Sequence, residues 1–293
     1  MAKSLQIVFD ELHILNKMLS MGTKLTKVLN FTKLENFVPL ILVLVIICAA
    51  KPALHNKQLK IIVIDAGHGG KDPGCKYDGV NEKDVTLQIA LATGKKIQEL
   101  LPDVKIIYTR TSDKFIELHQ RADIANKCEA DLFISIHCNA NKNSNVAGTE
   151  TFAMGLHKAE DNLDVSMREN GAILLENNYH DYYEGFDPNS PETHIILSLY
   201  QNAYLDKSLK LASRIEQNLG KQIERTSRGV KQAGFLVLWQ TKMPSVLIET
   251  GFLSNKSDRE LLKTDAGVDK ISTGIASSVA EYKRQGESTL VKN

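Results

Sequence analysis

The sequence predicts a single three-layer α/β domain, in which a twisted, mostly parallel central sheet is flanked by helices and carries a helical insertion. One observation is that three short runs, at residues 61–64, 132–136 and 246–248, are apolar on both faces, as strands inside a helix-covered parallel sheet are. A second is that amphipathic helical patterns alternate with the strands. A third is size, because 293 residues with 43% hydrophobic side chains suffice for one full α/β core.

The amino-terminal residues 1–50 are a separate leader. Residues 37–50 (FVPLILVLVIICAA) are uncharged and follow several lysines. A helix that spans a bilayer needs about 20 apolar residues, so this shorter stretch fits the centre of a signal peptide better. We therefore expect export to the periplasm or cell envelope with cleavage after Ala50, and keep a membrane anchor as the alternative. The leader is long enough for Met21 to be the true start, and residues 51–59 form a polar linker.

The folded domain is expected over residues 60–284, and its first half alternates strands and helices. Strand 61–64 leads through a glycine-rich loop to a helix near 85–101, for which Asn81 is the expected amino-terminal cap. The pattern then predicts, in order, a strand at 105–108, a helix near 116–127, a strand that ends at His137 and a strand at 149–153.

The stretch 156–222 interrupts this rhythm and is interpreted as a helical insert. It holds two helical patterns separated by the polar residues 179–191. The first, around 162–178, is acidic, and the second repeats apolar residues at helical spacing up to about residue 222. After the insert we expect strands at 234–238 and 245–249, a final amphipathic helix, and a polar tail at 285–293.

Ionisable side chains stand where three of the predicted strands end. His68 follows the first apolar run, His137 the second and Glu249 the third. Because the carboxyl ends of parallel strands share one edge of a sheet, we expect these side chains to meet there. With Glu82, which follows the loop after His68, they form the inventory of a catalytic zinc site. Such a site has three ligands, an open position and a free carboxylate that acts as base.

Each of these residues also has an ordinary structural interpretation. The two histidines could be hydrogen-bonded fillers, and Glu82 a carboxylate stabilised by the dipole of the following helix. Glu249 fits this interpretation least, because it would bury a charge at the end of an apolar strand. Asp65 is expected either to orient a ligand or to serve the turn, and Asn139 to help position a substrate.

Four motifs in sequence order, AGHGG, NEKD, SIHCNA and IETGFLSN, resemble those of the zinc-dependent N-acetylmuramoyl-L-alanine amidases of the bacterial cell wall (amidase type 3). The resemblance covers most of residues 60–283. It implies that His68, Glu82 and His137 hold Zn²⁺ and that Glu249 is the catalytic base. It also implies that peptidoglycan is the partner, cut at the amide bond between N-acetylmuramic acid and the L-alanine of the stem peptide.

The resemblance leaves two interpretations of the insert open. Some relatives in Gram-negative bacteria carry a helix at this place, which covers the zinc site until a partner protein removes it. On one interpretation the insert is such a lid, opened by an activator protein, and an acid such as Glu169 or Glu176 is placed to reach the metal, although neither acid is counted among the zinc ligands. The alternative is a structural elaboration that shapes the substrate groove.

Two other functions fit part of the pattern. A zinc peptidase of the carboxypeptidase type uses the same kinds of ligand, but its pattern starts HxxE. Here Glu82 follows His68 by fourteen positions (82 − 68). A non-catalytic module that binds the cell wall would be expected to lack a ligand or the base. The net charge of +1 gives no reason to expect a nucleic-acid partner.

Overall fold

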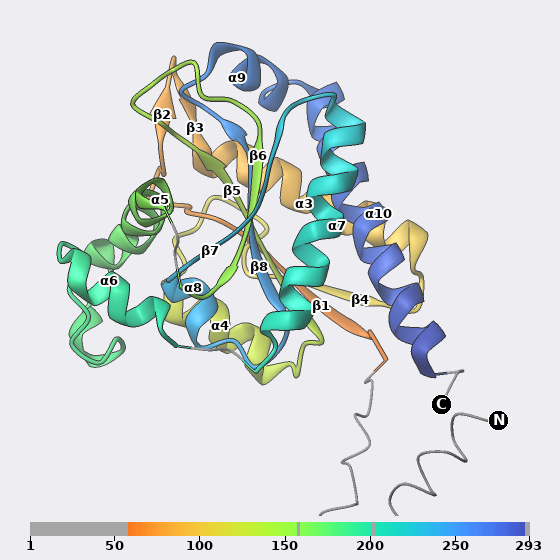
Figure 1. Cartoon of the computed structure of the whole chain (residues 1–293), viewed down its shortest axis with the longest axis horizontal. Helices are drawn as coiled ribbons and strands as arrows, with labels where there is room; N and C mark the ends of the chain where they lie inside the picture. The colour runs from red at the N-terminus through yellow and green to blue at the C-terminus, as the bar shows by residue number, and fades with distance from the viewer. Residues whose placement is uncertain (1–57, 157–158, 201–202, 291–293) are drawn as a thin grey trace, which may run out of the picture. The chain divides into compact units, whose positions relative to one another are not determined.

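The computed structural model describes residues 58–156, 159–200 and 203–290, so the predicted leader lies outside the described residues. Six strands form the central sheet in the order β4-β1-β5-β8-β6-β7 (Figure 1). Their bounds are β1 (Ile61–Ala66), β4 (Lys105–Tyr108), β5 (Leu132–Asn139), β6 (Thr149–Met154), β7 (Ser227–Ala233) and β8 (Ser245–Phe252). Strands β4, β1, β5 and β8 are parallel, whereas β6 is antiparallel to β8 and parallel to β7. The predicted mostly parallel α/β fold is confirmed.

Helices flank the sheet, and a small hairpin lies between β1 and the first of them. The hairpin pairs β2 (Lys76–Tyr77) with β3 (Val80–Asn81). The α-helices are α3 (Glu82–Leu100), α4 (Leu118–Lys127), α5 (Glu160–Asn170), α6 (Pro191–Ser198), α7 (Leu205–Ile223), α8 (Leu236–Trp239), α9 (Lys256–Leu262) and α10 (Asp265–Leu290). Short 3₁₀ segments, η1 (Gly171–Leu175) and η2 (Tyr179–Asp181), connect α5 to α6. Asn81 precedes α3 as predicted, but its side chain donates to Asp84 instead of capping the helix.

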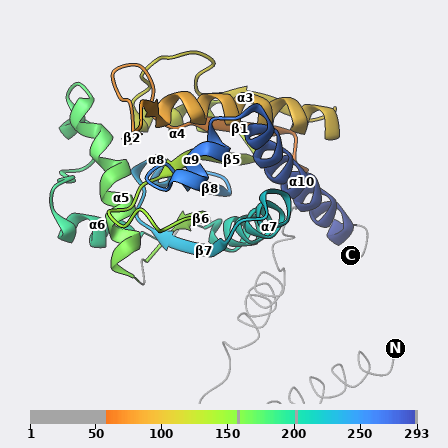
Figure 2. The ribbon, with the colours of Figure 1, turned by 90° about the horizontal axis from the view of Figure 1, so that it is seen from above.

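Alternation along the strands sends side chains to two faces of the sheet, and each face has its own core. On one face, residues such as Ile134 and Ile248 pack against α3, α7 and α10. On the other, Phe133, Phe152 and Leu247 pack against α4, α8 and the segment around α5 and α6. Figure 2 shows α7 and α10 on one side of the sheet and α5 and α6 on the other.

The stretch predicted as an insert therefore has two parts. Helix α7 buries Leu211, Ala212, Ile215 and Leu219 in the same core as α3 and α10, so it belongs to the helical layer that covers the sheet. The part from α5 to α6 lies on the other face, and it also contributes buried side chains, including Val165 and Ile173. We keep the name insert for residues 159–200, from α5 to α6.

Two predicted elements differ from the structure. The strand expected at 234–238 is largely the short helix α8, and the strand of this region is β7, which the sequence analysis missed. The tail expected from residue 285 is helical as far as Leu290, because α10 continues through it. Among the described residues, no helix is both long and apolar enough to cross a membrane.

Candidate functional site

Three elements of the sheet and one helix bring the four predicted site residues together. His68 follows β1 directly and has a left-handed backbone with φ 60°. His137 and Glu249 are register partners on the neighbouring strands β5 and β8, so their side chains leave the same face of the sheet. Glu82 is the first residue of α3 and is fully buried.

Glu169, on α5 of the insert, joins three of these residues in one cluster. Glu82 Oε1 lies 3.0 Å from His68 Nε2 and 3.2 Å from His137 Nδ1. Glu169 Oε2 lies 3.1 Å from the same His68 nitrogen and 2.9 Å from His137 Nδ1. One potential ligand atom from each residue lies within 4.8 Å of the others. The cluster therefore has the size and the donor types of a divalent-metal site.

Several buried polar atoms at this site have no hydrogen-bond partner among the described residues. They are His68 Nε2, Glu169 Oε2 and both carboxylate oxygens of Glu249. The short distances at His68 Nε2 thus lack the alignment of hydrogen bonds, and an unpaired buried polar atom costs about 1–3 kcal/mol. A bound cation would receive lone pairs from the imidazoles and carboxylates and remove this cost. Two nitrogen and two oxygen donors suit zinc among the common metals.

Buried carboxylates dominate the electrostatics of the cluster. Burial alone would lower the pKa of His137, but the carboxylates of Glu169 and Glu82 outweigh it and raise that pKa to about 9. Burial, together with the nearby Glu169 carboxylate, raises the pKa of Glu249 well above its usual range. The site therefore attracts positive charge, which a dication would supply.

Two glycines leave the space that the ligand side chains fill. A Cβ on Gly67 would lie 2.4 Å from Cε1 of His137. A Cβ on Gly74 would lie 2.6 Å from Glu82 Oε2 and 2.7 Å from His68 Cδ2, and the φ of Gly74 is 65°. Only residues without a Cβ let the backbone pass so close to these side chains. The glycine-rich sequence after β1 is therefore part of how the site is built.

Two buried aspartates hold His68 in place. Asp72 Oδ2 lies 2.8 Å from His68 Nδ1, which leaves Nε2 to face the cluster. Asp65 accepts a hydrogen bond from Arg121 Nη1 at 3.0 Å, and Arg121 Nη2 donates to the His68 carbonyl at 2.9 Å. Asp65 therefore acts on the loop through Arg121. The sequence analysis missed Asp72, although it stands four residues after His68.

Arg168, the neighbour of Glu169 on α5, extends the insert's contacts to Glu249, the predicted site residue outside the cluster. Its Nη2 lies 3.5 Å from Glu249 Oε1 and donates to Asn139 Oδ1 at 3.0 Å. Its Nη1 donates to the Ala140 carbonyl at 3.1 Å, and its Nε to Glu169 Oε1 at 3.0 Å. The insert thus brings the Glu169 carboxylate next to the two histidines and the Arg168 guanidinium next to Glu249.

A second group of potential ligands is separate from this cluster. It consists of Glu117, His119 and Glu176. The Glu176 carboxylate already accepts hydrogen bonds from the Leu118 N–H and the Tyr183 hydroxyl, both at 2.6 Å. Of the two insert acids considered from the sequence, Glu169 is the one in the predicted site.

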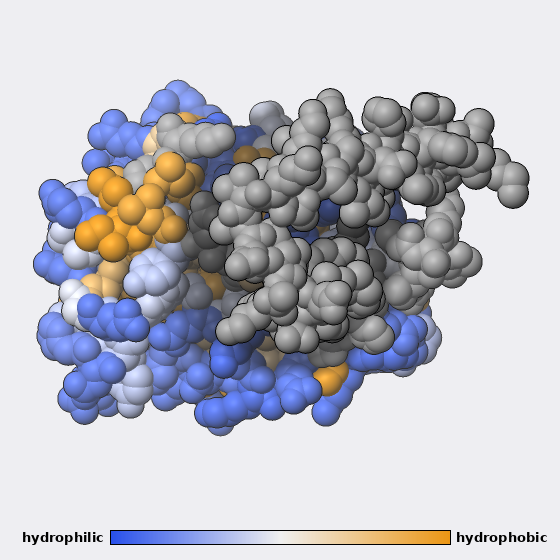
Figure 3. Space-filling view, turned by 60° about the horizontal axis from the view of Figure 1, so that its bottom comes forward, coloured by the Kyte–Doolittle hydropathy of each residue, from blue (hydrophilic) through white to orange (hydrophobic). Residues whose placement is uncertain are grey.

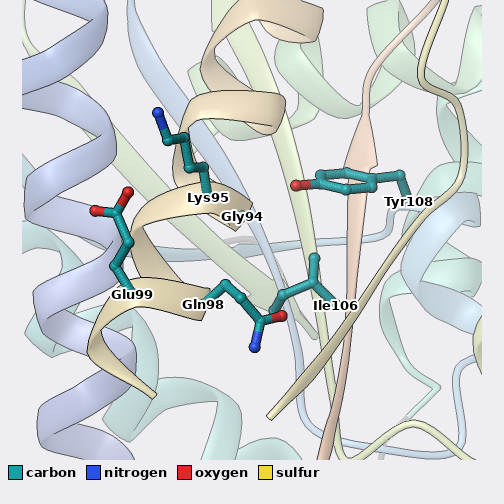
Figure 4. Close-up of a pocket in the computed structure, with 6 residues that line it drawn as sticks. All are labelled: Gly94, Lys95, Gln98, Glu99, Ile106 and Tyr108. Carbon is teal, nitrogen blue, oxygen red and sulfur yellow. The ribbon is translucent and has the colours of Figure 1, made fainter. Parts of the chain in front are cut away.

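A pocket in the surface lies away from these residues, between α3 and β4 (Figure 4). It is lined by Gly94, Lys95, Gln98, Glu99, Ile106 and Tyr108. The Tyr108 hydroxyl points to the helix at Gly94, where a Cβ would lie only 2.0 Å from it. This pocket contains none of the predicted site residues, and it marks close packing of α3 on an edge strand.

The fold and the cluster together define the class of α/β proteins with candidate metal ligands at the carboxyl edge of a mostly parallel sheet. More particularly, the chain belongs to the N-acetylmuramoyl-L-alanine amidase family, whose sequence profile matches residues 62–281. It is 35% identical to the N-acetylmuramoyl-L-alanine amidase AmiA of Escherichia coli (strain K12) over 228 residues, which are 76% of each protein.

Solved structures show the same relationship. The N-acetylmuramoyl-L-alanine amidase from Clostridium difficile 630 is similar with a TM-score of 0.57 and 28% identity, over 77% of this chain and 97% of that one. The CwlD amidase from Clostridioides difficile, solved in complex with the GerS lipoprotein, is similar with a TM-score of 0.55 and 26% identity. That similarity covers 76% of this chain and 98% of CwlD.

Proposed function

We propose that this chain is a zinc-dependent peptidoglycan hydrolase, which cleaves the amide bond between N-acetylmuramic acid and the L-alanine of the stem peptide. The observation that carries the proposal is the convergence of His68, Glu82 and His137 at one sheet edge, with the carboxylate of Glu249 on the same face. Membership of the amidase family supports the choice of substrate.

Each residue has one task in the proposed reaction. His68, Glu82 and His137 would hold Zn²⁺, which when bound polarises a carbonyl group and makes water more acidic. A carboxylate oxygen of Glu249 takes a proton from the attacking water and passes it to the departing amine of L-alanine. Asp72 keeps the imidazole of His68 in its orientation.

The test is hydrolysis of purified sacculi by the protein from Lys51 onward, with and without a chelator. We expect release of intact stem peptides, loss of release after chelation, and recovery on adding Zn²⁺. His68→Ala should lose both bound zinc and activity, whereas His180→Ala, at an exposed position of the insert, should keep both. Release of sugars in place of peptides, or full zinc content in His68→Ala, would contradict the proposal.

We also propose that the insert holds the free enzyme in a closed state. Glu169 Oε2 lies 3.1 Å from His68 Nε2 and 2.9 Å from His137 Nδ1, and Arg168 Nη2 lies 3.5 Å from the carboxylate of the proposed base. Both residues stand where a scissile carbonyl and the attacking water must come. The alternative, a groove-shaping insert, gives no reason for a carboxylate to lie 2.9 Å from His137 Nδ1.

A protein partner is the proposed means of opening. Exposed large apolar side chains gather on the insert, at Leu174, Leu175, Tyr182, Ile195, Ile196, Leu199 and Tyr200. Figure 3 shows apolar surface on the side of the molecule where α6 lies. Surfaces of this kind are typical of protein interfaces, and they are continuous with the segment that closes the site. The similar CwlD amidase was solved with a lipoprotein bound.

The proposed compartment is the cell envelope, where the substrate is. The apolar stretch 37–50 is the proposed export signal, and it lies outside the described residues. Mature protein recovered from the envelope should then begin near Lys51, which amino-terminal sequencing would show.

A further inference from the structure

A buried carboxylate next to the proposed base, that of Glu150, accepts hydrogen bonds from two cationic side chains. Glu150 on β6 is the antiparallel register partner of Glu249 on β8, so the two side chains lie on the same face of the sheet. Glu150 is 2% exposed. Its Oε1 accepts hydrogen bonds from Arg228 Nε and, at 2.8 Å, from Lys231 Nζ. Its Oε2 accepts one from Asn139 Nδ2 at 3.2 Å.

A β-bulge in β7 is what aims both cations at Glu150. Residues three apart on a regular strand, such as 228 and 231, point to opposite faces. Here β6 advances from Thr149 to Thr151 while β7 advances from Ser227 to Val230, so β7 contains one extra residue. Gly229 in the bulge has a φ of 83°. Bulges often re-aim side chains beside active sites.

Both cations remain accessible despite their shared partner. The Arg228 side chain is 29% exposed and that of Lys231 is 18% exposed. Each stands over an aromatic ring, Arg228 at 5.6 Å from that of Phe252 and Lys231 at 5.9 Å from that of Phe152. Two positive charges therefore face the carboxylate of Glu150, and both cationic side chains reach the surface.

We propose that Arg228 and Lys231 form a specificity site that binds a carboxylate of the stem peptide as the amidase cuts it. The inference rests on the proposed function and adds the recognition of an anionic group on the leaving peptide. An arginine beside a lysine offers several N–H donors to a carboxylate, which is a charge-assisted arrangement. Asn139 connects this site to the catalytic edge, because its Nδ2 donates to Glu150 and its Oδ1 accepts a hydrogen bond from Arg168.

The distance suits a short peptide. Neighbouring strands lie about 4.8 Å apart, so β7, two strands from β8, is roughly 10 Å from the strand of Glu249. An extended peptide spans about 3.5 Å per residue, so roughly three residues cover this distance. A carboxylate on the second or third residue of the stem, counted from L-alanine, can therefore reach Arg228 and Lys231 while the scissile bond lies at the metal cluster.

The test compares two muramoyl-peptide substrates that differ only in having free carboxylates or their carboxamides. For Lys231→Gln and Arg228→Gln we expect KM for the acid substrate to rise roughly 10-fold, the scale of losing one hydrogen bond to a charged group, with little change in kcat. On the carboxamide substrate these variants and the parent should have the same KM. Lys231→Arg retains the positive charge and should keep the lower KM for the acid substrate. Lys105→Gln, at an exposed site on the far edge strand, should keep it too.

Equal losses on both substrates, or an unchanged KM on the acid, would overturn the proposal. If neither the parent nor Glu169→Gln, in which the site is expected to be open, cleaves either substrate, the amidase function itself is contradicted. If the variants do not fold, product inhibition of the parent decides the question. The free peptide acid should inhibit more strongly than its carboxamide, and equal inhibition would overturn the carboxylate site.

Discussion

Glu169→Gln is expected to raise the basal rate at which this protein hydrolyses sacculi. The substitution keeps the shape of the side chain but removes its charge, so its oxygen binds a cation more weakly. The closed state then loses its contact with His68 and His137, and the hydrogen bond from Arg168 Nε no longer ends on a charged acceptor. More of the free enzyme is therefore open to substrate.

The magnitude follows from those contacts. A hydrogen bond to a charged group contributes about 1.5–3 kcal/mol, and losing it shifts the closed-to-open ratio by roughly 10- to 150-fold. Other contacts of α5 remain, because Asn170 donates to the Gly234 carbonyl and accepts from the Leu236 N–H, each at 2.8 Å. The fold should therefore survive, and the basal rate should rise by roughly 10- to 100-fold if closure limits it.

The assay is release of dye-labelled fragments from sacculi, with zinc content and urea unfolding measured on the same samples. Glu160→Gln, at an exposed position of the same helix, is the matched control and should behave as the parent. If Glu169→Gln folds, keeps its zinc and is no faster than the control, the closure mechanism is refuted. Deleting 162–178 is a poorer test, because it also removes Val165 and Ile173 from the core.

Three further outcomes are expected. Glu249→Gln should keep bound zinc while turnover falls by roughly 10²-fold or more, the scale of a lost general base; near-normal turnover would assign the base elsewhere. Asp65→Asn leaves Arg121, 1% exposed, without its ionic partner and should lower the free energy of unfolding in urea by about 3–5 kcal/mol; a change below about 1 kcal/mol would contradict this. Burial raises the pKa of Glu216, although three hydroxyls lower it in part. Its contribution to stability is therefore full below the pKa of the unfolded chain and is lost as pH rises through the folded value. Glu216→Gln should flatten the fall of unfolding free energy as pH rises above about 4.3, the usual pKa of a glutamate in an unfolded chain, and an unchanged slope would show that another group causes it.

The sequence predicted the elements whose apolar pattern depends on burial alone. Strands β1, β5 and β8 are buried on both faces, so they read as continuous apolar runs. Strand β7 is a partly exposed edge strand with the sequence SRGVKQA and a bulge, so it has no such pattern. The following LVLW is short and apolar, and periodicity cannot separate a strand from a buried helical turn at that length.

The same reasoning explains which parts of the site were predictable. His68, His137 and Glu249 stand at the ends of recognisable strands, and the structure brings them to one edge together with Glu82. Arg168 and Glu169 reach that edge from a helix of the insert, across contacts that no local pattern encodes. Asp72 belongs to a loop whose path depends on glycines at positive φ and not on periodicity.

The inner side of the insert has a consequence for how such an enzyme can change over generations. Val165, Ile173, Tyr183 and Phe186 lie in the same apolar cluster as Phe152 and Leu247 of the sheet. Selection for faster hydrolysis by loosening this segment would therefore also act on the melting temperature, since the same side chains contribute to both. Variants selected for faster hydrolysis are therefore expected to carry substitutions by other polar residues at positions 168 and 169, where the contacts are ionic. They should keep the apolar residues that pack against the sheet.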